Sequence, residues 1–324
     1  MLDQYNRNIN YLRISVTDRC NFRCIYCMPE KGIEARRHQD MLQFDEIVRI
    51  CTCAASLGIS RIKITGGEPF VRKGILDLIA MIHEIPGIDE ITMTTNGFYL
   101  KENIAQLQAA GVTGINLSLD TLNREHFTEI TRQNVLPIII DALQAALLAG
   151  LSGIKVNCVL LHQSTEELLQ LVLLAKDNPI QVRFIELMPI GAGSLYSGKS
   201  QDEMKVIIEQ TYGVMQPYTT QLGNGPAHYY SLSGFTGHIG FISAISHGFC
   251  ESCNRIRLTS DGFLKSCLNY EATVNLREVI RSGILDMELT EIMQQVIFYK
   301  PRHHGFLEAD HQNKETRTMV GIGG

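Results

Sequence analysis

The feature that most constrains the fold of this chain is a repeated alternation of strand-like and helix-like segments over its first two-thirds. Six short apolar stretches predict β-strands, at Leu12–Val16, Arg61–Thr65, Ile91–Thr94, Ile115–Leu119, Ile154–Leu160 and Val182–Ile185. Helical spacing follows each of them, at Asp45–Leu57, Ile75–Ile85, Glu102–Ala110, Pro137–Ala149, Thr165–Ala175 and Gln201–Tyr212. Successive βα units imply parallel strands with helices outside. The alternation alone leaves open whether the sheet is doubly wound or a partial barrel.

The pattern changes near Pro217. A Gly- and Pro-rich link at 222–226 precedes short predicted strands at Tyr229–Leu232, Ile239–Ile242, Arg255–Thr259 and Phe263–Cys267, the last two joined by a turn at Ser260–Gly262. Two helices are predicted near Leu276–Arg281 and Leu289–Phe298. We therefore expect two domains, an α/β unit at 1–216 and a smaller α+β unit at 217–324.

Charge and hydropathy narrow the function classes. The 324 residues carry a net charge of −5, so the overall field does not favour nucleic acid or an anionic membrane. The first residues lack the apolar core of a signal peptide, and no apolar run approaches the roughly 18 residues of a membrane span. We expect a bacterial-type cytoplasmic enzyme. Nine cysteines in a reducing compartment then point to metal rather than to disulfides.

The first cysteine group is Cys20, Cys24 and Cys27, in C-x3-C-x2-C spacing directly after the first predicted strand. Three thiolates on one loop can hold three irons of a [4Fe–4S] cluster and leave the fourth iron free for another ligand. A structural zinc site would need a fourth protein ligand, and no histidine lies nearby in the sequence. Zinc, or a group of unliganded thiols, is the alternative.

The second group is Cys250, Cys253 and Cys267. By spacing alone, a zinc site completed by His247 and a second iron–sulfur cluster are equally compatible. Cys51, Cys53 and Cys158 lie in a predicted helix and a predicted strand, where a free cysteine usually acts as a small buried hydrophobe.

The residues around both groups resemble a known family. Cys20 to Glu30 resembles the signature loop of the radical S-adenosylmethionine (SAM) superfamily, and Gly66-Gly67-Glu68-Pro69 follows the second strand as in that superfamily. The segment Phe249–Gly262, with Cys267-Leu268, resembles the C-terminal motif of the GTP 3′,8-cyclase family, which opens molybdenum cofactor biosynthesis. The resemblance extends from Arg13 to Gly324. It implies a partial (β/α)6 TIM-like barrel with a smaller C-terminal α+β iron–sulfur domain closing its mouth.

The resemblance also implies the reaction. Two [4Fe–4S] clusters and SAM would be the cofactors, and a 5′-deoxyadenosyl radical would remove the ribose 3′ hydrogen of GTP. The carbon radical would attack C8 of guanine, which the second cluster positions, to give (8S)-3′,8-cyclo-7,8-dihydroguanosine 5′-triphosphate. Expected partners are a low-potential flavodoxin- or ferredoxin-type electron donor, the downstream cyclic pyranopterin monophosphate synthase and a second copy of the chain in a homodimer.

Site residues follow position by position from the same resemblance. Tyr26, Gly67, Ser118 and Met188 would contact SAM, and GTP would be held by Arg13, Lys63, Thr94, Lys155, Arg183, Arg255, Ile256 and Arg257. A triphosphate needs several cations. The lysines and arginines of this set interrupt apolar strands, where an unpaired charge is expensive to bury. Alternation along a strand places Arg255 and Arg257 on one face. The catalytic set would be Arg255, Arg257, Gly323 and Gly324, with the glycine-rich tail entering the cavity.

Three positions depart from the family pattern. Lys63 replaces a common arginine, the loop Thr131–Asn134 lacks a glycine, and Ala244 replaces a common proline. Two rival functions are a radical maturase acting on a peptide and a non-catalytic zinc-binding module. The cation pair Arg255 and Arg257 disfavours the first rival.

Overall fold

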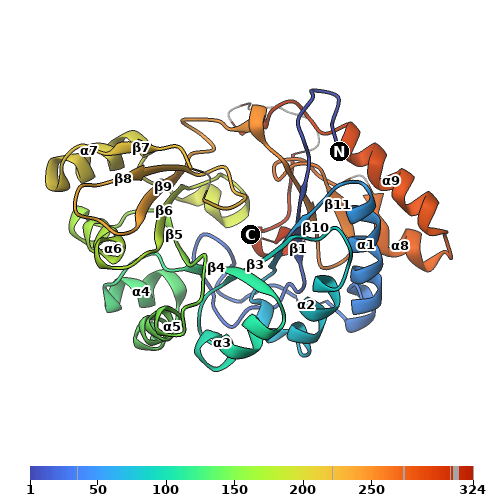
Figure 1. Cartoon of the computed structure of the whole chain (residues 1–324), viewed down its shortest axis with the longest axis horizontal. Helices are drawn as coiled ribbons and strands as arrows, with labels where there is room; N and C mark the ends of the chain where they lie inside the picture. Colours follow the sequence, from blue (N-terminus) through green and yellow to red (C-terminus); the bar gives the residue numbers. More distant parts are fainter. Residues whose placement is uncertain (35, 221, 273, 307, 309–313, 324) are drawn as a thin grey trace.

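A single sheet of twelve strands organises the chain. The computed structural model describes residues 1–34, 36–220, 222–272, 274–306, 308 and 314–323 (Figure 1). The strand order is β12-β11-β10-β1-β2-β3-β4-β5-β6-β9-β8-β7. The strands are β1 (Tyr11–Ser15), β2 (Arg61–Thr65), β3 (Glu90–Thr95), β4 (Val112–Ser118), β5 (Lys155–Leu160), β6 (Gln181–Glu186), β7 (Gln216–Tyr218), β8 (His228–Ser231), β9 (His238–Ile242), β10 (Arg255–Leu258), β11 (Phe263–Lys265) and β12 (Val274–Asn275).

The first six strands lie side by side in chain order, and every neighbouring pair among them is parallel. A doubly wound sheet would reverse its order at a switch point, so this winding is of the barrel type. The helices follow the outer side of the curved sheet (Figure 1). They are α1 (Phe44–Ser56), α2 (Ile75–His83), α3 (Leu100–Ala109), α4 (Arg124–Thr131), α5 (Leu136–Leu148), α6 (Thr165–Asp177), α7 (Gln201–Tyr212), α8 (Leu276–Arg281) and α9 (Asp286–Phe298). The predicted α/β class with a partial barrel is confirmed.

The segment after residue 217 does not build a sheet of its own. Its strand β9 pairs in parallel with β6, and its strand β10 pairs in parallel with β1 at the opposite end of the row. Antiparallel strands β8 and β7 then extend one edge, and β11 and β12 extend the other. The segment therefore continues the barrel at both edges, and the domain boundary at 217 stays a prediction.

Among the described strands and α-helices, three were absent from the sequence prediction. Strands β7 and β12 are too short to show a period. Helix α4 spans eight residues and begins where the Asn123 side chain accepts hydrogen bonds from the backbone N–H groups of Glu125 and His126. All the helices and strands that the sequence predicted are present, with their ends shifted by a few residues at most.

Alternation within the strands separates the core from the interior of the barrel. In β2, Ile62 and Ile64 are fully buried in the hydrophobic core, whereas Lys63 and Thr65 line a cavity. In β10, Ile256 and Leu258 belong to the core, and Arg255 and Arg257 line the same cavity. Since successive side chains point to opposite faces, each strand presents one apolar and one polar row.

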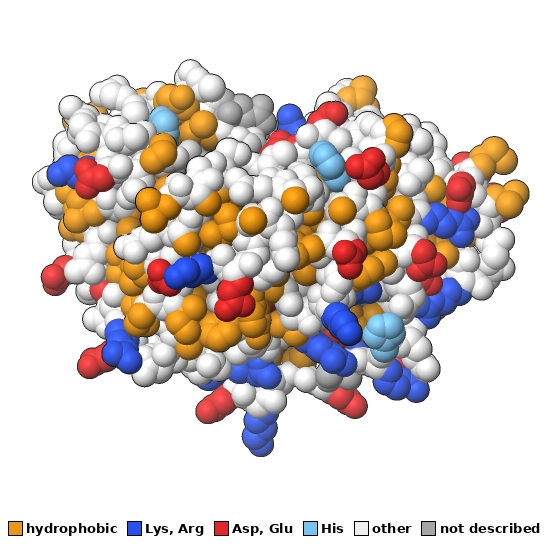
Figure 2. All heavy atoms as spheres, turned by 60° about the horizontal axis from the view of Figure 1, so that its bottom comes forward, with side chains coloured by type: hydrophobic (Ala, Val, Ile, Leu, Met, Phe, Trp, Pro, Cys, Tyr) orange, Lys and Arg blue, Asp and Glu red, His pale blue; other side chains and the backbone are white. Residues whose placement is uncertain are grey.

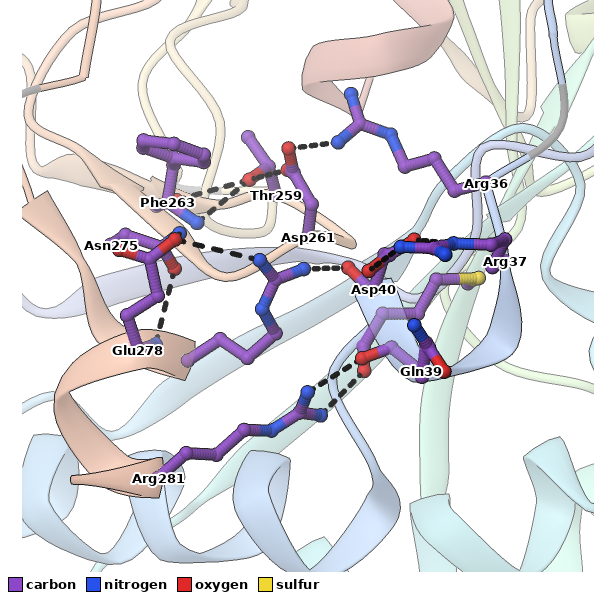
Figure 3. Close-up of polar contacts among 12 residues, drawn as sticks. Arg36, Arg37, Gln39, Asp40, Thr259, Asp261, Phe263, Asn275, Glu278 and Arg281 are labelled. Atoms are coloured by element: carbon purple, nitrogen blue, oxygen red, sulfur yellow. Dashed lines mark hydrogen bonds and ion pairs between the residues drawn. The ribbon is translucent and has the colours of Figure 1, made fainter. Parts of the chain in front are cut away.

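Polar contacts connect the segment after the first cysteine group to the C-terminal third (Figure 3). Arg36 forms an ion pair with Asp261 in the β10–β11 turn. Arg281, at the end of α8, donates to the backbone carbonyl oxygens of Gln39 and Met41. These bonds hold α8 and the hairpin against the first βα unit, and so keep β10 beside β1.

On the face shown in Figure 2, Lys and Arg side chains are interspersed with Asp and Glu side chains and with hydrophobic ones. Within the described part of the chain, no helix has both the length and the apolar character needed to cross a membrane.

Candidate active site

A cavity of about 260 Å³ lies inside the barrel, at the carboxyl ends of the parallel strands. Strand ends and the loops behind them supply its wall, as is usual for catalytic sites in parallel α/β folds. Residues from the C-terminal third also contribute, at Gly223–Pro226, Ile242, Leu268 and Met319. All six predicted GTP-binding cations line it: Arg13, Lys63, Lys155, Arg183, Arg255 and Arg257.

Strand register brings three of these cations to one level. Arg13 on β1 is paired with Lys63 on β2 and with Arg257 on β10. Because all three side chains point to the same face of neighbouring strands, their charges converge on one part of the cavity wall. Such a row supplies several donors at close range to an anion.

Burial makes these charges costly in the ligand-free protein. Lys63, Lys155, Arg183 and Arg257 are each less than a tenth exposed, and in the part of the chain that the structure describes none of the four has an acidic partner within 4.0 Å. Burial, aided by the neighbouring cations, lowers the pKa of Arg257 to about 9 and that of Lys155 to about 8. Burial also holds the pKa of Lys63 well below its usual range. A bound polyanion would offset this cost.

One side chain orients a cation, and one acid lies close by. Asn157 accepts a hydrogen bond from Arg183 Nε at 2.8 Å. Glu90 lines the cavity and partly compensates the charges of Lys63 and Lys155. The cavity nevertheless keeps an excess of positive charge.

The first cysteine group forms part of the wall of this cavity. Cys20, Cys24 and Cys27 are partly exposed free thiols that line it. Their loop is held by backbone hydrogen bonds from Cys27 N and Met28 N to Cys24 O, both 3.0 Å, and from Arg23 N to Thr131 O at 3.1 Å. Burial raises the pKa of Cys20 to about 11 and that of Cys27 to about 12, so these thiols become thiolates only against a positive centre.

The second cysteine group lines a smaller cavity of about 60 Å³ that shares Met188, Arg255, Arg257 and Leu268 with the first. Arg255 Nη2 lies 3.8 Å from Cys253 Sγ. Although burial opposes it, the charges of Arg255 and Lys300 lower the pKa of Cys253 to about 6. The two cysteine groups therefore line two cavities that share the cations Arg255 and Arg257.

The sulfurs of the cysteine groups are not gathered as closely as the ligands of a single ion. Among the described residues, only His126, Glu129 and His162 bring three metal-ligating atoms all within 4.8 Å of one another. At least two sulfurs in each cysteine group are therefore farther apart than that. Thiolates about 2.3 Å from one tetrahedral zinc ion would lie roughly 4 Å apart. Three thiolate donors are the usual ligand set of a [4Fe–4S] cluster whose fourth iron takes a ligand from outside the protein.

His247, the predicted alternative zinc ligand, lies elsewhere. Its Nδ1 is 2.8 Å from Ser246 Oγ, and its Nε2 is 3.7 Å from Asp202 Oδ1. The histidine beside the second cysteine group is instead His304, whose backbone N–H donates to Cys250 Sγ at 3.4 Å. Because His304 is far from these cysteines in the sequence, the sequence did not indicate this contact.

The four predicted SAM contacts all line the main cavity: Tyr26, Gly67, Ser118 and Met188. The Tyr26 hydroxyl donates to Asp120 Oδ2 at 2.9 Å. At Gly67 a Cβ would lie 2.1 Å from the carbonyl oxygen of Arg19, so glycine is required there for close contact with the cysteine loop itself.

Three further polar residues of this region were not selected from the sequence, although Glu68 lies in the quoted motif Gly66-Gly67-Glu68-Pro69. Glu68 is buried and accepts hydrogen bonds from Thr95 Oγ1 at 2.8 Å and from the Asn96 N–H at 2.7 Å. Burial raises the pKa of Glu68 to about 7. Asn96 Nδ2 lies 3.9 Å from Cys20 Sγ, and Asp120 fixes Tyr26. All three residues follow the ends of predicted strands, and this position in the sequence could have indicated that they lie near the site.

Two predicted substrate residues differ in placement. Thr94 lines the cavity, on β3 beside Asn116 of β4. Ile256 is fully buried in the hydrophobic core on the opposite face of β10, so its side chain does not reach the cavity. Alternation directs its neighbours Arg255 and Arg257 inward instead, so a contact of Ile256 with GTP would be made by its backbone, and the prediction of Ile256 as a GTP-binding residue stays a prediction.

The C-terminal tail reaches the cation row. After Arg317, which lies 3.4 Å from Asp261, residues Met319–Ile322 form a short 3-10 helix. The carbonyl oxygen of Gly323 accepts a hydrogen bond from Arg257 Nη1 at 3.3 Å. Gly323 has a φ of 76°, and a Cβ there would lie 2.8 Å from Ser15 Cβ, so glycine is required. Gly324 lies outside the described residues.

Comparison with known proteins gives the family. The family model described as "Radical SAM superfamily" matches residues 14–175, and the one described as "Molybdenum Cofactor Synthesis C" matches residues 180–306. A relative named GTP 3′,8-cyclase from Clostridium perfringens (strain 13 / Type A) is 44% identical over 325 residues, covering 100% of both chains. One of the same name from Petrotoga mobilis is 42% identical over 326 residues, covering 99% of this chain and 100% of the relative.

Solved structures support the fold. The crystal structure of Streptococcus suis SuiB bound to S-adenosylmethionine has a TM-score of 0.64 at 17% identity, covering 93% of this chain and 68% of that one. The hydrogenase maturase HydG from Carboxydothermus hydrogenoformans has a TM-score of 0.52 at 19% identity, covering 62% of this chain and 50% of that one. At these identities the likeness concerns the fold alone.

Proposed function

This chain belongs to the radical SAM superfamily and, within it, to the GTP 3′,8-cyclase family, and we propose that it converts GTP into (8S)-3′,8-cyclo-7,8-dihydroguanosine 5′-triphosphate. This is the first step of molybdenum cofactor biosynthesis. The observation that carries the proposal is the set of six cations in one cavity between two groups of three cysteines. A nucleoside triphosphate is the substrate class that needs such a set.

The cysteines assign the cofactors. Cys20, Cys24 and Cys27 would hold one [4Fe–4S] cluster, and Cys250, Cys253 and Cys267 would hold a second. When bound, the first cluster and SAM supply the 5′-deoxyadenosyl radical that removes a hydrogen atom from the ribose of GTP. Tyr26, held by Asp120, would contact SAM together with Gly67, Ser118 and Met188.

The cations orient the substrate. Arg13, Lys63 and Arg257, at one register level, would hold the triphosphate, with Arg183 fixed in direction by Asn157. Arg255 lies beside Cys253 and would act on the part of the substrate near the second cluster, which would hold the base. Binding two reactive groups in one closed space replaces a bimolecular encounter and excludes water from the radical.

The tail would act through Arg257. The Gly323 carbonyl accepts from Arg257 Nη1, so an inserted tail limits the directions that this guanidinium can take. In this proposal the tail orients Arg257 toward GTP. Gly323 and Gly324 therefore contribute to the reaction through Arg257 and do not touch the reacting atoms.

A peptide substrate is disfavoured by the same charges. It would leave several buried cations without an anion, and each such charge costs free energy. The proposed external partners are a low-potential flavodoxin- or ferredoxin-type donor and the cyclic pyranopterin monophosphate synthase that takes the product.

The deciding experiment is anaerobic turnover of the iron-loaded protein with GTP, SAM and a strong reductant, followed by mass analysis of the nucleotide. The cyclised product and 5′-deoxyadenosine should form together, and neither should form when SAM is omitted. Iron content near eight atoms per chain is expected for two [4Fe–4S] clusters. Cleavage of SAM without any change in GTP would contradict the proposed substrate.

A further inference from the structure

A second, separate group of metal-type ligands lies outside the cavity, between α4 and the loop after β5. His126 and Glu129 are three residues apart on α4 and so share one face of that helix. His162 follows the end of β5. One ligand atom from each lies within 4.8 Å of the other two. We propose that these three side chains bind a divalent transition-metal ion of the zinc type.

The distances suit a tetrahedral ion. His162 Nε2 and Glu129 Oε1 are 3.5 Å apart. Two ligands about 2.0–2.1 Å from a tetrahedral zinc ion lie roughly 3.4 Å apart, so this pair already has the spacing of one edge of the coordination shell. The rings of His126 and His162 have their centroids 4.9 Å apart. Two imidazoles and one carboxylate form a common zinc donor set that leaves a fourth position for water.

His126 supplies the independent observation. Its side chain is only 11% exposed, and its Nε2 atom is buried with no hydrogen-bond partner among the described residues. A buried polar atom without a partner is costly and rare, and it calls for an unrecorded ligand. A metal ion between His126, Glu129 and His162 would satisfy this atom.

The other ring nitrogen is already held. His126 Nδ1 lies 2.7 Å from Glu167 Oε1, and Glu167 is itself fixed by Thr121 Oγ1 at 2.8 Å and by the backbone N–H of Ser164 at 2.9 Å. A carboxylate that accepts the Nδ1 proton leaves the Nε2 lone pair available and sets the ring direction. This is the arrangement that histidine ligands of metals usually have.

The position gives the ion a structural role. The last turn of α4 holds the first cysteine loop, through Arg23 N to Thr131 O at 3.1 Å and Ile25 N to Ile130 O at 2.9 Å. An ion joining α4 to the β5–α6 loop would therefore fix the helix on which the loop of Cys24 rests. The site lies apart from the catalytic cavity, whose lining includes none of its three ligands.

The test is equilibrium dialysis of the anaerobic holoenzyme, with both cysteine groups occupied by iron, against Zn²⁺ at micromolar free concentration. Bound zinc is counted by mass spectrometry. Wild type should bind one zinc ion per chain beyond its iron. The variants His162→Ala and Glu129→Gln alter exposed side chains and should each weaken binding at least about tenfold. Glu125→Gln, also exposed and on the same helix, is the matched control and should bind as wild type does.

Two results would overturn the proposal. One is a holoenzyme that binds no zinc at these concentrations. The other is zinc that remains bound with unchanged affinity in both His162→Ala and Glu129→Gln. Because the iron content of all four proteins is measured in the same samples, loss of an iron–sulfur cluster would be seen separately.

Discussion

Replacing Arg257 by methionine tests the site because it should change two quantities in opposite directions. Arg257 is 8% exposed, and the positive charges of Arg13 and Arg255 act on its guanidinium. Burial and these neighbours lower its pKa from 12.5 to about 9. Each tenfold change in a protonation equilibrium corresponds to about 1.4 kcal/mol. The charged form of Arg257 is therefore disfavoured by several kcal/mol when no nucleotide is bound.

Methionine has a similar length and no charge, so the variant escapes this cost. It loses one hydrogen bond to Gly323 O, worth about 1 kcal/mol. We expect a net gain of about 1–3 kcal/mol in the free energy of unfolding of the nucleotide-free, iron-loaded protein. Affinity for GTP should fall by about 1.5–3 kcal/mol, or roughly 10- to 100-fold, because a charge-assisted contact is lost.

Anaerobic calorimetry measures both quantities, as the melting temperature without nucleotide and as the dissociation constant for GTP. SAM binding should be unchanged. Arg124→Met, at an exposed position at the start of α4, is the control and should alter neither quantity. A melting temperature that falls together with GTP affinity would mean that Arg257 is a structural residue. GTP affinity equal to that of wild type would remove Arg257 from the substrate site.

Three further predictions concern the cofactors, the pH dependence and the tail. Cys24→Ala should abolish 5′-deoxyadenosine, whereas Cys253→Ala should keep some SAM cleavage and lose the cyclised product; normal product from the Cys253 variant would contradict a substrate role for the second cluster. Lysine is charged below its pKa and bound GTP would raise that pKa, so the Lys155 contribution to GTP affinity should be fully present below about pH 8 and decline as the pH rises above it. Lys155→Arg should remove this part of the pH dependence, as calorimetry across that range would show. Deleting Gly323 and Gly324 should leave GTP binding within about tenfold while the cyclised product falls sharply, and Gly323→Ala should act similarly because its Cβ would meet Ser15; full product formation by the truncated chain would refute a role for the tail.

Local pattern was enough for the elements and for the chemistry of the ligands. Strand β2 and helix α7 have the bounds that apolar periodicity predicted, and each cysteine group can be recognised because its ligands lie close together in the chain. The inward direction of Arg255 and Arg257 also follows from the sequence, because alternation along a strand is a local property. These features depend on residues separated by a few positions, and a sequence shows such relations directly.

Tertiary structure alone decided how distant segments meet. The register that aligns Arg257, Arg13 and Lys63, the placement of β9 and β10 at opposite ends of the barrel row, and the contact of His304 with Cys250 all join residues far apart in the chain. The same holds for His126, Glu129 and His162, whose spacing in the sequence carries no metal motif. Strand pairing and packing are set by the total burial of apolar surface in the whole fold, so no single segment contains the information that fixes them.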